Sequence, residues 1–262
     1  MSEHVADGKA LNGKVLDGKV AIVTGAGGGF GESYSRCLPE AGASVAMVDV
    51  AGDRAAAAAA RLAADGLAVV PATVDVTDPD AVHAMVATTV DAFGGVDILV
   101  NNAALMAEIP YDIPLAKLSL DWWNRVLAVN LTGPFLCIQA VVPAMRARGG
   151  GRIVNQSSGG AFGPSHVYGV SKLGLVSLTV AMATELAPFG ITVNALAPGF
   201  TSTEAGMRSM PEEMTPVIQQ LAPLGRGAPD DVHGALLLLA SPNGTWITGQ
   251  TLNVDGGWVM RI

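Results

Sequence analysis

Residues 19–31, KVAIVTGAGGGFG, decide the fold of this chain. Lys19–Thr24 is a short apolar run typical of a buried parallel strand, and a helical pattern through Leu38 follows the glycines. Glycines here let the backbone turn tightly and let a pyrophosphate approach the amino end of the helix, where free N–H groups favour anions. Because a strand precedes the glycines and a helix follows them, the stretch predicts a dinucleotide-binding turn in preference to a flexible loop.

An acidic residue stands near the end of the second expected strand. Ala43–Val50 is apolar and carries Asp49 about 20 residues after the glycines. A carboxylate there can bind both hydroxyls of an adenosine ribose and would repel a 2′-phosphate, so we expect NAD as the cofactor. An exposed aspartate at a strand end is the alternative, and the position makes it the weaker interpretation. Asp75, after a third strand over Val69–Val74, could face the adenine.

Strands and helices alternate to the end of the chain. Further strands are expected at Val96–Val100, Arg152–Asn155, Ile191–Ala197 and Thr251–Val254. Further helical patterns cover Ser119–Arg148, His166–Leu186 and Pro229–Ala240. This alternation predicts an α/β fold, a Rossmann-type doubly wound parallel seven-stranded sheet with helices on both faces. We expect a single dinucleotide-binding domain at 18–262 after a polar lead-in at 1–17, with a mobile helical flap at 201–224 over the substrate.

Tyr168 and Lys172 stand four residues apart in the helix that begins at His166, so they share one face. A phenol has an unperturbed pKa of about 10, and a neighbouring ammonium is expected to lower that pKa toward neutral pH. Ser157 or Ser158, just after the fifth strand, can hydrogen-bond a substrate oxygen. This set suits proton transfer to or from an alcohol or carbonyl oxygen. The pair alone is equally typical of an amphipathic helix with a solvated lysine.

The positions of the candidate site residues at the ends of the predicted strands favour the catalytic interpretation of Tyr168 and Lys172. Ligands of doubly wound sheets bind at the carboxyl ends of the strands, and each residue in question lies at or just after such an end: Gly25–Gly31, Asp49, Asp75, Asn101, Ser158 and Pro198. Asn130 is different, because it lies inside a long apolar helical pattern. An asparagine is mildly unfavourable there, and its side chain either satisfies backbone groups or has a function.

Taken together, the motifs resemble the short-chain dehydrogenase/reductase family from about Leu16 onward. The matching segments are Thr24-Gly25-x-x-x-Gly29-x-Gly31 in the cofactor loop, Asn101-Asn102-Ala103 after the fourth strand, and Asn194 through Pro198-Gly199 near the nicotinamide. Positions that fall on the family's catalytic tetrad are Asn130, Ser158, Tyr168 and Lys172. The chain departs from the family pattern at Ala104, where glycine is usual, and at Phe30, where a smaller aliphatic residue is usual.

The resemblance implies a role for each of these residues. Tyr168 would be the acid/base, Ser158 (with Ser157 as second choice) would position the substrate oxygen, and Lys172 would lower the pKa of the tyrosine and hold the nicotinamide ribose. Asn130 would support a proton-relay water. The implied cofactor contacts are Gly25, Gly29, Phe30, Gly31, Asp49, Asp75, Val76, Asn102, Ala103, Tyr168, Lys172, Pro198, Gly199 and Thr201, the last to the carboxamide. The resemblance also implies a homodimer or homotetramer, built through the two long helices and the last strand.

Composition excludes several other classes of protein. The formal charge is −8 and no basic block occurs, which argues against a nucleic-acid partner. The four histidines have no metal-ligand spacing, so no metal is expected. Cys37 and Cys137 lie in apolar helical patterns and are expected to be reduced. We find no signal peptide and no run of about 18 apolar residues, so a cytoplasmic protein without membrane contact is expected.

The expected substrate is a bulky, largely apolar secondary alcohol or ketone, alicyclic or steroid-like. The flap offers Met207, Met210 and Met214, which suit an irregular apolar ligand or else pack on the protein itself. Segments expected to add to the apolar wall are Leu105–Ala107 and Ala161–Phe162. A coenzyme A thioester becomes a candidate if Arg208 faces the pocket entrance. Alternatives to this NAD-dependent alcohol dehydrogenase or ketone reductase are a 3-oxoacyl-thioester reductase, which Asp49 disfavours, and a non-catalytic NAD-binding regulator.

Overall fold

A computed structural model describes residues 14–260, and its centre is a seven-stranded parallel sheet in the order β3-β2-β1-β4-β5-β6-β7. The strands are β1 (Val20–Thr24), β2 (Ser44–Asp49), β3 (Val69–Thr73), β4 (Ile98–Asn101), β5 (Gly151–Gln156), β6 (Ile191–Pro198) and β7 (Thr251–Val254). The predicted Rossmann-type sheet is therefore confirmed. The continuous apolar runs in β1, β4 and β6 arise because these strands are buried on both faces.

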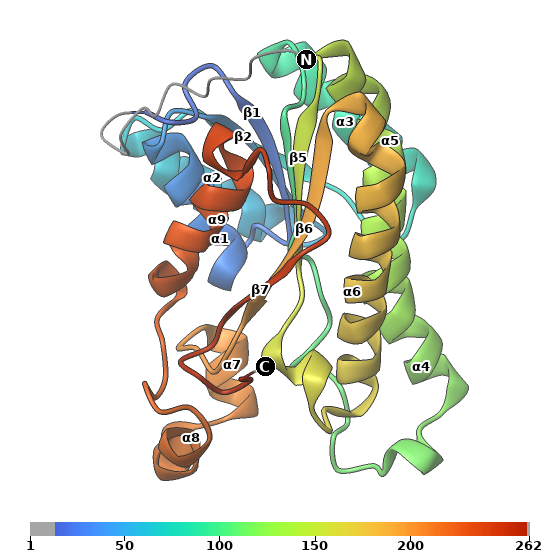
Figure 1. Ribbon diagram of the computed structural model, residues 1–262, viewed down its shortest axis with the longest axis vertical. Helices are drawn as coiled ribbons and strands as arrows, with labels where there is room; N and C mark the ends of the chain where they lie inside the picture. Colours follow the sequence, from blue (N-terminus) through green and yellow to red (C-terminus); the bar gives the residue numbers. More distant parts are fainter. Residues whose placement is uncertain (1–13, 261–262) are drawn as a thin grey trace.

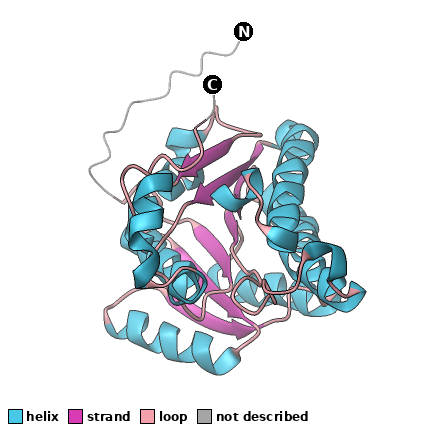
Figure 2. Ribbon diagram, turned by 90° about the horizontal axis from the view of Figure 1, so that it is seen from below, coloured by secondary structure: helices cyan, strands magenta, loops and turns pink. Residues whose placement is uncertain are grey.

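Helices cover both faces of the sheet, as Figures 1 and 2 show. One layer holds α1 (Gly29–Glu40), α2 (Gly52–Ala64) and α9 (His233–Ala240). The other holds α3 (Pro79–Phe93), α5 (Gly133–Ala147) and α6 (His166–Leu186), preceded by α4 (Leu120–Leu127). Each layer buries its own apolar core against the sheet, so the chain has the three-layer arrangement that its alternating pattern predicts.

The strand order reverses between β1 and β4, and this reversal positions the ligand site. From β1 the chain adds β2 and β3 on one side, then returns to add β4 through β7 on the other. Connections leaving β1 and β4 therefore diverge at their carboxyl ends and leave a crevice there. In Figure 1 the segment carrying α7 (Glu204–Ser209) and α8 (Thr215–Leu221) lies below this end of the sheet.

The helix predicted at Ser119–Arg148 is not regular along its length. A π-helical turn, Ala128–Thr132, separates α4 from α5 and contains Asn130. Short π segments often mark functional positions in helices. At this π turn the Asn130 amide forms hydrogen bonds to the Leu105 backbone and the Ser171 side chain, both outside the helix. Hydrophobic periodicity does not reveal such contacts. The helix predicted at Pro229–Ala240 likewise begins with a 3₁₀ turn, Pro229–Val232, before α9.

Two other expectations need correction. The predicted lead-in lies outside the described residues up to position 13, and within the rest of it Leu16 is fully buried and donates its N–H to the Ala41 carbonyl. The packed domain therefore begins before residue 18. Two helical runs, Leu120–Ala147 and His166–Phe189, do have the length and apolar composition of a membrane span, with mean hydropathies of 1.7 and 1.4. Core helices pass the same test, and both runs contribute residues to the core against the sheet.

Gly31 is where α1 approaches the cofactor turn most closely, so Gly31→Ala should destabilise the fold. A Cβ at this position would collide with the Gly25 carbonyl oxygen and would lie 2.8 Å from the Ala26 Cα. Overpacking against backbone costs about 1–3 kcal/mol, and each kcal/mol lowers the melting temperature by roughly 2–4 °C in a chain of this size. Thermal unfolding without cofactor measures the effect.

Gly234→Ala is the matched control for that measurement. Gly234 is exposed in α9 and an added Cβ meets nothing within 4 Å, so the same change should be neutral or slightly stabilising. Equal melting temperatures for the two variants would show that α1 does not depend on the close approach at Gly31.

Candidate active site

The glycine turn between β1 and α1 leaves no room for side chains. Gly25 and Gly29 have φ angles of 66° and 55°, which glycine adopts without strain. A Cβ on Gly25 would lie 2.8 Å from the Ala103 Cα, and one on Gly27 would lie 2.9 Å from the Asp49 carboxylate. The turn is thus a cradle of bare backbone at the amino end of α1, which is the arrangement that accommodates a pyrophosphate.

Asp49 lies beside this cradle at the end of β2. Its Oδ2 accepts from the Gly27 N–H at 2.9 Å and its Oδ1 accepts from the Ala51 N–H at 2.9 Å. The two backbone bonds fix the carboxylate at the mouth of the turn. Arg54 lies over the same glycines, since a Cβ on Gly28 would be 2.7 Å from its guanidinium. Arg54 was not among the predicted site residues, although its place five residues after Asp49 puts it close to the cofactor turn.

Asn102 connects the ends of β1 and β4. Its amide nitrogen donates to the carbonyl oxygens of Thr24 at 2.8 Å and Gly25 at 3.0 Å. The Thr24 hydroxyl in turn accepts from the N–H groups of Asn102 and Ala103, at 3.0 and 3.1 Å. These four hydrogen bonds hold the cofactor turn against the loop that follows β4.

Two predicted cofactor contacts lie away from the cavity described below. The Asp75 carboxylate accepts from the backbone and hydroxyl of Thr77, at 2.9 and 2.7 Å. Val76 is buried and packs in the core between the sheet and α3. Gly31 and Asn130 also do not line the cavity. The cofactor contacts of Asp75, Val76 and Gly31 and the proton-relay role of Asn130 stay predictions.

Tyr168 and Lys172 lie on one face of α6, as expected, but their pKa values differ from the expectation. Burial raises the pKa of Tyr168 to about 12, and a hydrogen bond with the Ser158 hydroxyl opposes this rise. Burial also lowers the pKa of Lys172 to about 7. The lysine is 2% exposed, and its Nζ donates to the Gln156 carbonyl at 2.7 Å. In this structure desolvation of both groups therefore outweighs the attraction between ammonium and phenolate.

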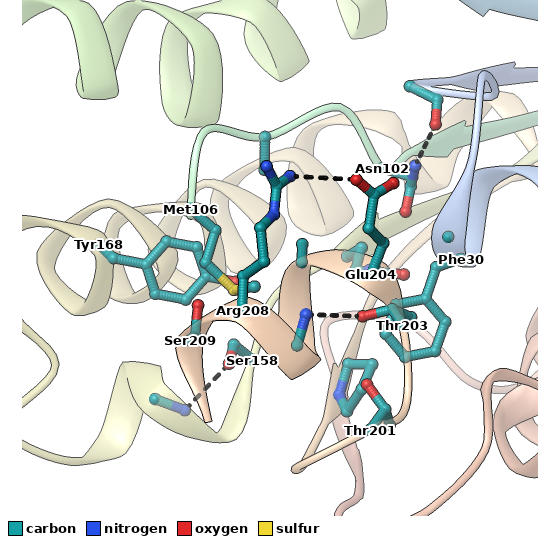
Figure 3. A pocket seen from close by; sticks show the side chains of 18 of the residues that line it. Phe30, Asn102, Met106, Ser158, Tyr168, Thr201, Thr203, Glu204, Arg208 and Ser209 are labelled. Atoms are coloured by element: carbon teal, nitrogen blue, oxygen red, sulfur yellow. Dashed lines mark hydrogen bonds and ion pairs between the residues drawn. The ribbon is translucent and has the colours of Figure 1, made fainter. Parts of the chain in front are cut away.

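The two candidate serines have different surroundings. Ser157 is buried, and its hydroxyl donates to the Lys172 carbonyl at 3.1 Å. The Ser158 hydroxyl accepts from the Gly160 N–H at 3.1 Å and lies near enough to Tyr168 to lower the pKa of its phenol. Figure 3 shows Ser158 and Tyr168 on the same side of the cavity. The geometry therefore favours Ser158 as the partner of the tyrosine.

Asn130 is fully buried and bridges three segments. Its Oδ1 accepts from the Leu105 N–H at 2.7 Å, and its Nδ2 donates to the Leu105 carbonyl and the Ser171 hydroxyl, both at 3.0 Å. The asparagine thus joins the π turn to the loop after β4 and to α6 next to Lys172. Its mid-helix position is explained by these contacts.

A cavity of about 590 Å³ brings the two halves of the site together. Predicted site residues that line it are Gly25, Gly29, Phe30, Asp49, Asn102, Ala103, Ser158, Tyr168, Lys172, Pro198, Gly199 and Thr201. The cavity thus extends from the glycine turn to the tyrosine, and in Figure 3 Phe30 and Tyr168 lie at opposite sides of it. One continuous space can accept a dinucleotide and place its reactive end beside a proton donor.

The substrate side of the cavity is more polar than expected. Of the three flap methionines only Met210 lines it, and of Leu105–Ala107 only Met106 does. Unpredicted lining residues on this side include Glu108, Tyr111, Ser209 and Trp258, whereas Thr203 and Glu204 lie near the glycine turn. No periodic pattern marked them, because they lie in the loop after β4, in the flap and in the segment after β7.

Arg208 lines the cavity, which meets the condition set for a coenzyme A thioester. Glu204 lies between two arginines, 3.4 Å from Arg54 and 3.7 Å from Arg208. All three side chains are more than half exposed, so these ion pairs are weak and can exchange for a charged ligand.

Comparisons with known proteins agree with this geometry. A family model described as enoyl-(acyl carrier protein) reductase matches residues 25–259. An uncharacterized oxidoreductase of Mycobacterium tuberculosis is 45% identical over 94% of this chain and 100% of its own length. The 3-oxoacyl-[acyl-carrier-protein] reductase of Synechocystis is 39% identical over 94% and 98%.

A solved structure extends the likeness to three dimensions. The short-chain type dehydrogenase/reductase from Mycobacterium marinum superposes with a TM-score of 0.84 at 35% identity, over 94% of this chain and 97% of that one. With the glycine cradle, Asp49 and the Ser158–Tyr168–Lys172 group in one cavity, the chain belongs to the short-chain dehydrogenase/reductase family of oxidoreductases.

Proposed function

We propose that this protein is an NAD-dependent oxidoreductase that interconverts a secondary alcohol and a ketone. The observation that carries the proposal is the single cavity lined by both Asp49 and Tyr168. A non-catalytic NAD-binding regulator would not require Ser158 and Tyr168 to line one cavity, nor Lys172 to be buried beside the phenol.

The residues of the chain supply the proton chemistry. In alcohol oxidation Ser158 holds the substrate oxygen while Tyr168 accepts its proton, and in ketone reduction the same phenol donates the proton. Lys172 is anchored by Gln156 and lies 5.7 Å from the centre of the Tyr168 ring. When bound, the nicotinamide cofactor accepts or donates the hydride.

Two features of the site support NAD as the cofactor in this proposal. Bare backbone at Gly25–Gly29 accommodates the diphosphate, because a Cβ on Gly25, Gly27 or Gly28 would collide with neighbouring atoms. Asp49 is held with its carboxylate at the mouth of this cradle, where it would accept from ribose hydroxyls and repel a 2′-phosphate.

The proposed substrate is a bulky, largely apolar ketone or secondary alcohol, alicyclic or steroid-like, bound against Met106, Met210 and Trp258. A 3-oxoacyl thioester is the second candidate, favoured by the cavity position of Arg208 and by the likeness to the Synechocystis reductase.

We also propose a homodimer or homotetramer in the cytoplasm. Helix α6 carries an exposed apolar stripe of Val170, Leu173 and Val180, which are 42%, 50% and 51% exposed. An apolar stripe of this kind on a long helix is typical of a surface that a second subunit covers.

Tyr168→Phe should lower turnover by a factor on the order of 10²–10⁴, the usual contribution of general acid–base catalysis. Its affinity for NADH, measured by fluorescence titration, should change little, because the ring and its packing remain. Turnover close to that of the unmodified protein would remove Tyr168 from the proton step.

The pH profile should reflect the raised pKa of Tyr168. Alcohol oxidation needs the phenolate, whose fraction increases tenfold per pH unit below the pKa of about 12. We therefore expect kcat/KM for oxidation to rise throughout pH 7–9, while ketone reduction, which uses the protonated phenol, stays nearly constant. If kcat/KM for oxidation instead rises and levels off before pH 8, Lys172 lowers the pKa of the Tyr168 phenol in the working enzyme.

Asp49 should make NAD the preferred cofactor by about 30-fold or more in kcat/KM, since a close pair of like charges costs ~2 kcal/mol or more. Asp49→Asn should reduce that preference. Asp53→Asn removes the same charge from an exposed neighbour outside the cavity and should leave it unchanged. Equal use of NAD and NADP by the unmodified protein would show that the assignment of Asp49 is wrong.

A further inference from the structure

His166, the first residue of α6, has a strained backbone. Within residues 14–260 it is the one non-glycine residue with positive φ, at 54°. Such a conformation costs about 1–3 kcal/mol and persists only where the surroundings impose it. Strained residues cluster at functional sites, and His166 lies two positions before Tyr168.

Contacts to the loop after β4 impose this conformation. The His166 Nε2 donates to the Ile113 carbonyl at 2.9 Å, and its ring lies 5.7 Å from the ring of Tyr111. The next residue, Val167, is fully buried and packs with Ile109 and Val126 in a small core to which Tyr168 also contributes. The start of α6 and the loop are therefore one packed unit.

This unit places the Tyr111 side chain in the cavity. Tyr111 lines the cavity and is 44% exposed, so a ligand can reach it. In Figure 3 Met106, from the same loop, lies beside Tyr168 and across the cavity from Phe30, which is on the cofactor turn. The ring contact of Tyr111 with His166 and its charge interaction with Tyr168 place Tyr111 on the substrate side and not on the adenosine side.

Tyr111 is also electrostatically coupled to the catalytic tyrosine. Burial, then the negative charge of ionised Tyr168, then Glu108 raise the pKa of Tyr111. The Tyr111 phenol therefore stays protonated at working pH, as a neutral hydroxyl that can donate to or accept from a substrate oxygen. Because this hydroxyl lies near Tyr168 but on another segment of the chain, it can hydrogen-bond a second polar group of the substrate.

We propose that Tyr111, positioned by His166, is a specificity-determining residue that hydrogen-bonds a second hydroxyl or carbonyl group of the substrate. The substrate class is then an alicyclic hydroxyketone or the corresponding diol, rather than a ketone with a single oxygen. This inference rests on the proposed ketone reductase function and adds a polar contact to its largely apolar pocket.

The test compares kcat/KM for cyclohexanone, 2-hydroxycyclohexanone and 4-hydroxycyclohexanone in NADH-dependent reduction. The unmodified protein should prefer at least one hydroxyketone. Tyr111→Phe should lower the ratio of that hydroxyketone to cyclohexanone by about 3- to 10-fold, the contribution of one neutral hydrogen bond. Asp112→Asn, in the same loop but outside the cavity, should leave the ratio unchanged.

A second variant tests the positioning role of His166. Asparagine tolerates positive φ but is too short to replace the bond to Ile113, so His166→Asn should lower the same ratio. In the Tyr111→Phe background it should lower the ratio no further, because the hydroxyl it positions is already absent. A role confined to folding would lower the melting temperature and the rate with every ketone, without a change in the ratio.

The other outcomes separate this inference from the proposed function. If the protein reduces these ketones but Tyr111→Phe does not change the ratio of kcat/KM for hydroxyketone to that for cyclohexanone, the proposed role of Tyr111 is wrong. The proposed ketone reductase function is then unaffected. A preference for cyclohexanone over both hydroxyketones also overturns the role of Tyr111. No turnover of any of the three, with NADH bound, contradicts the proposed substrate class and removes this inference with it.

Discussion

The bonding between Thr24 and Asn102 is the constraint on which the site depends. At the point where the strand order reverses, β1 and β4 are neighbours whose connections diverge, so the backbone groups at their ends lose their sheet partners. The Asn102 amide satisfies the carbonyls of Thr24 and Gly25, and the Thr24 hydroxyl satisfies two N–H groups. The diverging connections are thereby held at a fixed separation. The connection after β1 carries the glycine turn, and the connection after β4 carries the loop on the substrate side. The same four hydrogen bonds therefore fix the position of the glycine turn relative to that loop.

Solvent exclusion decides the protonation of Tyr168 and Lys172. A charged lysine and a charged phenol would both have to be buried, and burial of a charge is costly unless a partner compensates it. Burial favours a neutral Tyr168 and a Lys172 that loses its proton near neutral pH. The sequence argument considered only the attraction between the two groups. Spacing on a helix shows that two side chains meet, but it does not show how much water remains around them.

Sequence reasoning succeeded wherever a residue's place follows from local pattern. The bounds of α6 and β7, His166–Leu186 and Thr251–Val254, match the expected ones. It failed where distant contacts decide. The π turn coincides with the bonds of Asn130 to Leu105 and Ser171, 25 and 41 residues away in sequence. Leu16 was assigned to the polar lead-in, yet it belongs to the core cluster that also holds residues of α1 and α9.

The same distinction divides the active site. Its cofactor half is built on strand ends, so its residues occupy positions that any chain with this alternation would provide. Its substrate half is built on segments held by long-range contacts, such as His166 to Ile113, Arg226 to Met210, and Phe200 to Trp258. Those contacts decide which methionine or tyrosine faces the cavity. A few substitutions in these segments can therefore change the substrate, while the sheet, the glycine turn and Tyr168 stay unchanged. We therefore expect changes in substrate specificity to arise in the loop after β4 and in residues 201–224.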